Sequence, residues 1–343
     1  MNLKVGMTLV ACLSMAVLSC TIGGSPGSSL VAVKRSQMHM GTLVFITAAG
    51  RTHDEANQAI TAGFHEIKRL EQLLSTWIPE SELSQVNAAA GQGAVRVSLE
   101  TMVVVRKSLQ VAEMTDGAFN IAIGPAVDAW NISAEPRVPS AEELTGLKPL
   151  VDLQNVHTDV WERTIQLQKP GMRIDVGGIG KGYAADQAVV VMKKAGATAG
   201  VVALSGDIKT FGRLPNGTAI PVGIRHPRRE GEILAEIDLQ DEAISTAGDY
   251  ERFFEKDGVR YHHILDPHTL QPARGCQSVS VIAKEGVWAD GLDTGIFVLG
   301  AERGMELVEQ LEDVEAVIVG SDGRVLVSSG LRNRVRLRGV SSQ

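Results

Sequence analysis

The amino-acid sequence predicts a mixed α/β or α+β fold, built as one compact unit whose mixed sheets are flanked by helices. Helical periodicities alternate with short runs of β-branched residues, and several expected strands follow one another directly along the chain. No repeat of fixed period and no low-complexity run interrupts the chain after residue 36. The 343 residues suffice for one large domain, which we expect over residues 37–340.

The first half of the chain combines strands with capped helices. Residues 31–47 predict one or two strands, interrupted at Met40-Gly41-Thr42, where the glycine suggests a bulge or a close backbone approach. Thr52 and Ser140 each precede a Glu by three positions, a capping motif that begins a helix. We also expect helices over residues 81–90 and 98–115, a turn-rich stretch over 118–125, and strand pieces over 156–176.

The second half contains most of the expected strands. A helix from Tyr183 to Ala195 follows a glycine-rich loop. A buried helix is expected over residues 287–299, and an amphipathic one over 302–311. The expected strands cover residues 199–204, 208–211, 221–225, 233–239, 243–246, 260–265, 278–283, 315–319 and 324–327, the last two forming a hairpin.

The overall charge limits the possible partners. The formal net charge is −7, from 33 Lys and Arg against 40 Asp and Glu, which argues against nucleic-acid binding. Aromatic residues make up 4% of the chain, so the core must consist mainly of aliphatic side chains.

Residues 1–19 have the form of an export signal. Lys4 supplies the positive start, and the apolar run over residues 5–18 is too short to span a bilayer. The run ends directly before Cys20, as in the signals of bacterial lipoproteins, whose cysteine is lipidated on its thiol and becomes the mature N-terminus. A plain signal peptide cut near an unrelated cysteine is the alternative.

Lipidation of Cys20 would make residues 20–36 a flexible tether, because the stretch after it is rich in Gly and Ser. We therefore expect an exported protein that a lipid anchors to a bacterial membrane, facing the periplasm or the outside. Cys12 would leave with the signal, so Cys276 would have no partner for an intrachain disulfide. Cys276 is then either a small buried residue or a catalytic thiol.

The stretch Ile174–Asp186 contains the most informative functional pattern in the sequence. Four glycines (Gly177, Gly178, Gly180 and Gly182) surround Lys181 just before a helical pattern. Glycine lets a ligand approach the main chain closely, and a helix N-terminus favours anions. The stretch predicts a phosphate-binding turn, with a purely structural turn as the alternative. It fits neither the P-loop spacing nor G-x-G-x-x-G.

An acidic cluster is expected on the late helix. Asp290, Asp293 and Thr294 share one helix face, because positions i, i+3 and i+4 do so. Two carboxylates and a hydroxyl suit a hard divalent cation such as Mg²⁺. The alternative is that the carboxylates favour the helix N-terminus through its dipole. The apolar residues around them count against that alternative, because unpaired buried carboxylates are costly.

Other candidate residues have two interpretations each. His262 and His263 are adjacent on an expected strand and face opposite ways, so at most one enters a given site as a base. The polar stretch Ser245–Arg252 is a binding rim or merely a turn. Trp77 and Phe119 either stack on a flat ring or close a core edge.

These patterns resemble the ApbE family of FAD:protein FMN transferases. The resemblance covers residues 38 to 300 and lies in eight stretches that occur in the family's order. They are Met40-Gly41-Thr42, Ser81-Glu82-Leu83, Thr115-Asp116-Gly117-Ala118-Phe119, Asp175–Asp186, Ser205-Gly206-Asp207, Ser245–Glu255, His263–Pro267 and Ala289–Gly300.

The resemblance implies a T-fold-like unit that binds FAD and Mg²⁺ and cleaves the pyrophosphate. FMN would pass through a phosphoester to a Thr of a partner flavoprotein, with AMP released. The acceptor would carry a Ser-Gly-Ala-Thr or Ser-Gly-Ser-Thr type motif in a subunit of a membrane redox complex. By motif, His263 would be the base, Gly178 (through its backbone), Asp290, Asp293 and Thr294 would hold the metal, and Met40, Trp77, Ala118, Phe119, Asn120, Asp175, Lys181 and Ile264 would line the FAD site.

The sequence departs from the family pattern at three points. Ser205-Gly206-Asp207 stands where Gly-Gly-Asp is usual, and Asn120 replaces an Asp. His268 and Leu270 replace an Arg and a turn Gly beside the expected base. Two other functions stay open: an Mg²⁺-dependent FAD pyrophosphatase, in which water replaces the Thr hydroxyl, and a non-catalytic FAD-binding lipoprotein.

Overall fold

The structure, a computed structural model, describes residues 30–214 and 216–338. The expected signal over residues 1–19, the lipidated Cys20 and most of the tether lie outside the described residues. Within the described part, no helix is both long and apolar enough to cross a membrane.

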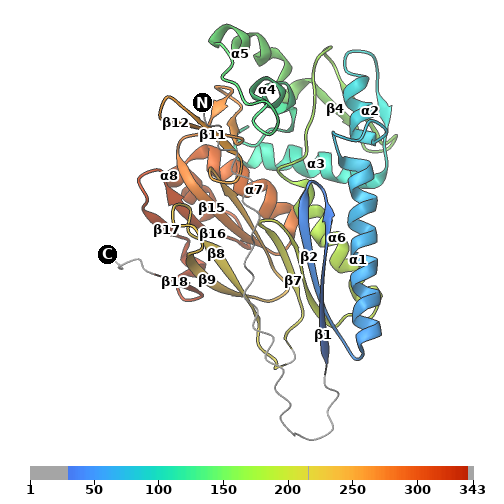
Figure 1. Cartoon of the computed structure of the whole chain (residues 1–343). Helices are drawn as coiled ribbons and strands as arrows, with labels where there is room; N and C mark the ends of the chain where they lie inside the picture. The colour runs from blue at the N-terminus through green and yellow to red at the C-terminus, as the bar shows by residue number, and fades with distance from the viewer. Residues whose placement is uncertain (1–29, 215, 339–343) are drawn as a thin grey trace, which may run out of the picture.

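The centre of the fold is an antiparallel sheet of eight strands in the order β1-β2-β6-β7-β10-β15-β16-β17 (Figure 1). The predicted class, a unit that combines several sheets with flanking helices, is confirmed, but the sheets are not mixed, because every strand pair in the described residues is antiparallel. The strands are β1 (Val31–His39), β2 (Thr42–Gly50), β6 (Ala199–Leu204), β7 (Asp207–Phe211), β10 (Ala243–Gly248), β15 (Cys276–Ala283), β16 (Val314–Gly320) and β17 (Val325–Val327).

Helices cover one face of this sheet. The helices α1 (His53–Leu74), α6 (Gly180–Lys194), α7 (Gly286–Leu299) and α8 (Ala301–Val308) contact successive strands from β1 to β16. Alternate strand residues such as Ile46, Val202 and Val281 enter the main core together with these helices. This alternation is what a strand with two distinct faces requires.

A second, smaller sheet covers the other face. The strands β8 (Ile220–Arg225), β9 (Ile233–Leu239) and β18 (Val335–Leu337) pair in the order β18-β9-β8. Ile282 and Val317 of the large sheet pack against Val222 and Ile237 of the small one. The molecule therefore has three layers, with helices, a large sheet and a small sheet in that order.

The remaining helices and strands lie toward one end of the molecule, at the top of Figure 1. They are α2 (Glu82–Ala88), α3 (Leu99–Met114), α4 (Gly124–Trp130), α5 (Ala141–Leu147), β3 (Val95–Arg96), β4 (Val156–Asp159), β5 (Thr164–Leu167), β11 (Phe253–Lys256), β12 (Val259–His262), β13 (Leu265–Asp266) and β14 (Gln271–Pro272), with short 3₁₀ turns at Ile121–Ile123, Lys148–Leu150 and Leu153–Asn155. A further 3₁₀ turn, Ser329–Leu331, lies between β17 and β18 and contacts β16.

The predicted capping motifs are confirmed. The Thr52 side chain accepts a hydrogen bond from the Glu55 N–H at 3.1 Å, and the Ser140 side chain accepts one from Glu143 at 3.1 Å. Each bond satisfies an N–H that the first helical turn leaves unpaired.

Several element predictions were wrong in detail. The break at Met40-Gly41 is a two-residue hairpin turn, because both residues have positive φ (49° and 68°) and no extra residue is inserted as in a bulge. Helix α6 begins at Gly180 instead of Tyr183, so Lys181 lies in its first turn. Helix α4 was not expected, although Pro125 occupies a first-turn position that suits proline.

Candidate active site

The glycine-rich loop and the acidic helix meet at one point, as predicted. The backbone N–H of Gly182, in the first turn of α6, donates to Oδ2 of Asp290 on α7 at 2.8 Å. Nζ of Lys181 lies 3.6 Å from Oδ1 of the same carboxylate. The N-terminus of α6, which was expected to bind a phosphate, therefore already binds one carboxylate of the protein itself.

Three buried carboxylates gather at this point. Asp207 from β7 and Asp290 and Asp293 from α7 each offer one oxygen, and these oxygens lie within 4.8 Å of one another. Their exposed fractions are 5%, 2% and 3%. We call these residues the acid cluster. Asp207 was not predicted as a site residue, although it follows a buried strand in the turn Ser205-Gly206-Asp207, and polar residues at such a position signal a site.

Hydroxyl groups join the acid cluster together. Oγ of Ser245, on β10, donates to Oδ2 of Asp293 at 2.7 Å and also contacts Asp207. Oγ1 of Thr294 donates to Oδ1 of Asp293 at 3.0 Å. Ser245 belongs to the stretch interpreted as a binding rim or a turn, and its side chain is buried within the site. The cluster therefore presents oxygen atoms alone, which is the donor set that hard cations prefer.

The backbone of Gly178 lies directly beside the cluster. A Cβ atom at this position would be 3.3 Å from Oγ1 of Thr294 and 3.3 Å from the Phe119 ring. This close approach brings the main chain of the loop to the hydroxyl that was predicted with it as a metal ligand.

The acid cluster carries more negative charge than its surroundings neutralise. Burial and the neighbouring carboxylates raise the pKa of Asp290 to about 7, and the same causes raise the pKa of Asp293 well above its usual value. Burial disfavours the Lys181 ammonium, but Asp207 and Asp290 outweigh that effect and raise its pKa. One ammonium beside three carboxylates leaves an excess of negative charge, which a divalent cation would neutralise.

The two adjacent histidines have different environments. Nε2 of His262 lies 2.7 Å from the Ala273 carbonyl, and its Nδ1 accepts from the Ile264 N–H at 3.3 Å. His262 is thus fully bonded within the fold. Nδ1 of His263 is buried and has no hydrogen-bond partner within residues 30–214 and 216–338. Burial and then the Arg252 charge lower the pKa of His263 to about 3, so its imidazole is neutral at physiological pH.

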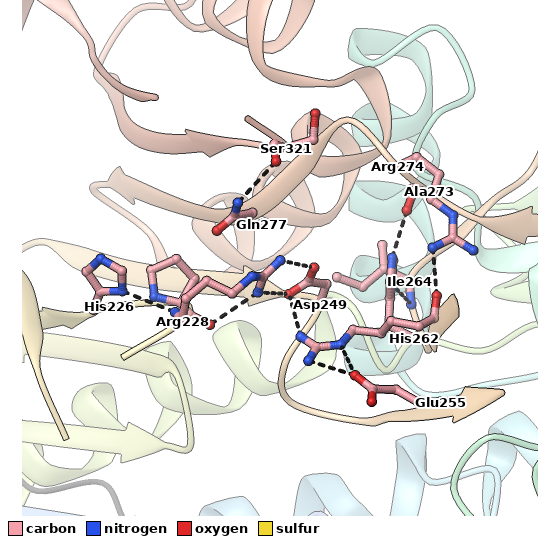
Figure 2. Close-up of polar contacts among 12 residues, drawn as sticks. His226, Arg228, Asp249, Glu255, His262, Ile264, Ala273, Arg274, Gln277 and Ser321 are labelled. Carbon is pink, nitrogen blue, oxygen red and sulfur yellow. Dashed lines mark hydrogen bonds and ion pairs between the residues drawn. The ribbon is translucent and has the colours of Figure 1, made fainter. Parts of the chain in front are cut away.

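A charged network holds the segment before His263. The Asp249 carboxylate accepts two hydrogen bonds of 2.6 Å from Arg228, and Arg260 lies 3.7 Å away (Figure 2). The chain continues from Asp249 to Arg252, whose carbonyl accepts from the His263 N–H at 3.1 Å. Loops from three parts of the sequence are therefore tied together beside the unpaired imidazole.

Three predicted FAD-site residues lie around the glycine-rich loop with accessible surface. The Met40 methyl carbon is 4.0 Å from the Cβ position of Gly180. Asp175 accepts from the Gly177 N–H at 2.7 Å, and its other oxygen is 3.5 Å from Oγ1 of Thr76. The side chain of Trp77, next in the chain, is 81% exposed, which excludes the interpretation that it closes a core edge.

Four other residues predicted for the FAD site are buried or make hydrogen bonds within the protein. Phe119 belongs to the main core, in agreement with the second interpretation given for it. Ala118 and Ile264 are buried as well. The Asn120 side chain accepts from the Ala122 N–H at 2.7 Å and donates to the Val151 carbonyl at 2.9 Å. Their roles toward a ligand stay predictions, as do the roles of the metal ligands and of His263.

The missing glycine beside His263 does not remove the turn. Leu270 adopts a left-handed conformation with φ of 57°, which costs a leucine about 1 kcal/mol. Its buried side chain and a 2.8 Å hydrogen bond from Trp130 Nε1 to its carbonyl hold it there. Cys276 is buried, and burial raises the pKa of its thiol to about 12, which favours a packing role over a reactive one.

The fold and the site define a class of protein: a helix-covered antiparallel sheet with a buried, oxygen-only cluster against a glycine-rich helix N-terminus. The chain belongs to the ApbE family, whose model matches residues 40–318. It is 33% identical over 341 residues to a protein of Treponema pallidum named FAD:protein FMN transferase, covering 94% of each chain. A Klebsiella pneumoniae protein of the same name is 33% identical over 286 residues, covering 82% of this chain and 88% of its own.

Solved structures agree with this assignment. The ApbE protein of Thermotoga maritima matches with a TM-score of 0.83 and 31% identity, covering 88% of this chain and 98% of its own. The structure named flavin transferase ApbE from Vibrio cholerae matches with a TM-score of 0.80 and 28% identity, covering 89% and 99%.

Proposed function

We propose that this protein is an Mg²⁺-dependent FAD:protein FMN transferase. FAD would be cleaved at its pyrophosphate, and FMN would pass to a Thr hydroxyl of an acceptor flavoprotein. The new bond joins the Thr oxygen to the FMN phosphorus, the bond from that phosphorus to the bridging oxygen breaks, and AMP leaves. The name shared by the curated relatives supports this function. The main structural observation in its favour is the excess negative charge of the acid cluster beside the glycine-rich loop.

The residues of the site fit a magnesium ion. The carboxylates of Asp290 and Asp293, the Thr294 hydroxyl and the Gly178 backbone would hold it, with Asp207 close enough to take part. When bound, the ion would neutralise charge on the pyrophosphate oxygens. The elevated pKa of Asp290 supports this fit, because a carboxylate whose charge is disfavoured in the bare site gains most from a cation.

The residues of this chain would contribute binding, orientation and one proton transfer. Nδ1 of His263 would take the proton of the acceptor hydroxyl, since it has no hydrogen-bond partner among the described residues. Its lowered pKa keeps the imidazole neutral but also makes it a weak base, so the family motif and the free Nδ1 support this role, and the pKa does not. The first turn of α6, with Lys181, would face the phosphates. Trp77 offers an exposed aromatic face for a flat ring, with Met40 as a thioether wall beside the loop.

The partner and the location complete the proposal. We expect the acceptor to be a flavoprotein subunit of a membrane redox complex, with the Thr in a Ser-Gly-Ala-Thr or Ser-Gly-Ser-Thr type motif. The enzyme would be exported and anchored to a bacterial membrane through a lipid on Cys20. The apolar run ending at this cysteine supports that location.

The test is a transfer reaction with purified components. The protein is incubated with FAD, MgCl₂ and a peptide carrying the acceptor motif, and the peptide is then weighed by mass spectrometry. We expect one FMN phosphoester per peptide, and none on a peptide whose Thr is replaced by Ala. Release of FMN and AMP without any modified peptide would instead favour the pyrophosphatase, and intact bound FAD would favour a non-catalytic binder.

A further inference from the structure

The N-termini of α6 and α7 cross in direct backbone contact. A Cβ atom at Gly182 would lie 2.1 Å from the Gly286 carbonyl oxygen, and one at Gly286 would lie 2.7 Å from the Gly182 carbonyl oxygen. Both distances are too short for any side chain. The two glycines therefore allow the first turns of the two helices to touch.

Neither helix has a side-chain cap from its own flanking residue. The residue before α6 is Ile179 and the residue before α7 is Glu285, and neither side chain makes a capping hydrogen bond. The first N–H groups of a helix need acceptors when they are buried. These acceptors come from the opposite helix in both cases.

The caps are reciprocal. Asp290 on α7 accepts from the Gly182 N–H of α6 at 2.8 Å. Asp186 on α6 accepts from the Gly286 and Val287 N–H groups of α7, at 2.8 Å and 3.0 Å. The residue that caps α6 is thus a member of the acid cluster, and Asp186, which caps α7, is not a member.

Asp186 is a costly residue to keep in this place. Its side chain is 13% exposed, and burial raises its pKa despite the two N–H groups that it accepts from. The nearest cation is Lys209, whose Nζ lies 3.8 Å away and is itself bonded to the Lys284 carbonyl. The negative charge of Asp186 is therefore stabilised mainly by the N–H groups in the first turn of α7.

The position of that first turn controls the acid cluster. Asp290 and Asp293 lie three and six residues after Val287 on the same helix, and the two carboxylates share one face of α7. A small rotation of α7 about its axis would move both carboxylates away from Asp207 and Ser245. The two bonds to Asp186 oppose that rotation, since they tie adjacent N–H groups to the two oxygens of one carboxylate.

We propose that Asp186 is a positioning residue, which fixes the rotation of α7 so that Asp290 and Asp293 face Asp207 at the separation needed to hold Mg²⁺. This inference rests on the proposed function, since it concerns the same cation. It assigns a role to the last residue of the stretch Ile174–Asp186, which contacts neither the cluster nor its hydroxyls.

The test is calorimetric titration of the metal-free protein with MgCl₂ alone, without FAD or acceptor. Asp186→Asn keeps one acceptor oxygen and places an NH₂ group opposite the other N–H. We expect the dissociation constant for Mg²⁺ to rise about tenfold, the loss typical of residues that orient metal ligands without touching the metal. Asp186→Ser, which offers one acceptor, serves if the Asn variant does not fold.

The control is Glu82→Gln, because the Glu82 carboxylate also holds the start of a helix from a different element, away from the site. Glu82 of α2 accepts from the Ser98 N–H at 2.9 Å and from Oγ1 of Thr101 at 2.5 Å, at the start of α3. We expect this variant to melt at a lower temperature, with its Mg²⁺ affinity within about twofold of the parent, since α3 carries none of the predicted ligands.

Each outcome is decisive. An unchanged Mg²⁺ affinity in a folded Asp186 variant overturns the proposal, and so does an equal loss in Glu82→Gln, which would indicate general destabilisation. A parent protein that binds no Mg²⁺ overturns the metal site itself, and the transfer reaction described above then fails as well. A loss specific to Asp186 supports the positioning role.

Discussion

The acid cluster and the Asp249 network are two charged regions built around buried carboxylates, and their charge balances differ. In the network, the Asp249 carboxylate faces Arg228, in a bidentate contact, and Arg260, which is also bonded to Glu255 (Figure 2). In the acid cluster, three carboxylates share one ammonium, and the pKa values of Asp290 and Asp293 are raised. A buried charge is tolerated when it is paired.

This contrast indicates which region is suited to a partner from outside the chain. The Asp249 network is neutralised by the protein's own arginines, so it can serve as a fixed support for the loop before His263. The acid cluster has three carboxylates beside one ammonium and places oxygen atoms close together, an arrangement that favours a cation from outside the chain. The same contrast separates His262, which is fully bonded, from His263, whose Nδ1 has no partner.

The largest effect is expected from Asp290→Ala. Removing this carboxylate deletes a predicted metal ligand, so FMN transfer should fall by about 100-fold or more. The fold should be retained, because relief of the repulsion among buried carboxylates offsets the loss of the hydrogen bond that Asp290 accepts from the Gly182 N–H. Transfer is measured by mass spectrometry in limiting MgCl₂, and folding by circular dichroism. A variant as active as the parent under these conditions would remove Asp290 from the metal site.

The next effect is expected from His263→Ala. Loss of the base should slow transfer by about 100-fold, while the dissociation constant for FAD changes little. His262→Asn is the matched control: it should lower the melting temperature, since both ring nitrogens are bonded, and spare transfer by the folded protein. A parallel loss of FAD binding and transfer in His263→Ala would make its role structural.

A smaller, graded effect is expected from pH. Because the pKa of Asp290 is raised to about 7, the bare site holds protons that Mg²⁺ must displace. Displacement of the Asp290 proton alone should therefore raise the affinity for Mg²⁺ by up to about tenfold per pH unit until the pH passes about 7, and the raised pKa of Asp293 adds to this rise. Titration calorimetry in buffers of different ionisation enthalpy reports the released protons, and binding without proton release contradicts the prediction.

The sign of the stability change without metal follows from the same shift. Between the ordinary carboxyl pKa and about 7, the native acid cluster binds more protons than the unfolded chain does. The free energy of unfolding of the metal-free protein should therefore decrease as pH rises through this window, as far as these groups determine it. Saturating Mg²⁺ should remove that decrease.

The sequence was sufficient where a pattern is local. Capping motifs placed the starts of α1 and α5, and the spacing of Asp290, Asp293 and Thr294 predicted one shared face of a helix. Runs of β-branched residues predicted most strands of the large sheet, because such residues fit a pleated, half-buried surface. The start of α6 was misplaced because glycine usually signals a loop, whereas Gly180 and Gly182 are helical here.

The contacts that complete the site could not be predicted locally. Asp207 and Ser245 reach the acid cluster because β7 and β10 are neighbours in the sheet, and that strand order is a property of the whole fold. Arg228 meets Asp249 across two loops that are 21 residues apart. Each of α6 and α7 is capped by a residue of the other helix, which is far away in the sequence, so no motif beside either N-terminus predicts these caps.

The smallest effect on Mg²⁺ binding is expected from Asp249→Asn, which tests the other half of the comparison. The change leaves Arg228 without its carboxylate, and the free energy of unfolding should fall by about 1–3 kcal/mol. The low end applies if solvent screens Arg228, whose side chain is 38% exposed. Affinity for Mg²⁺ should stay within about twofold of the parent, since the network holds no predicted ligand.

The matched control for this variant is Asp238→Asn, which breaks another bidentate pair, with Arg336 at 2.8 Å and 3.1 Å, on the exposed small sheet. It should destabilise the protein less than Asp249→Asn, because exposed ion pairs contribute little. Denaturant unfolding and MgCl₂ titration are made on both variants. If Asp249→Asn weakened Mg²⁺ binding as strongly as Asp290→Ala, the Asp249 network and the acid cluster would act as one site. The proposed distinction between a network that its own arginines neutralise and a cluster that binds a cation would then be wrong.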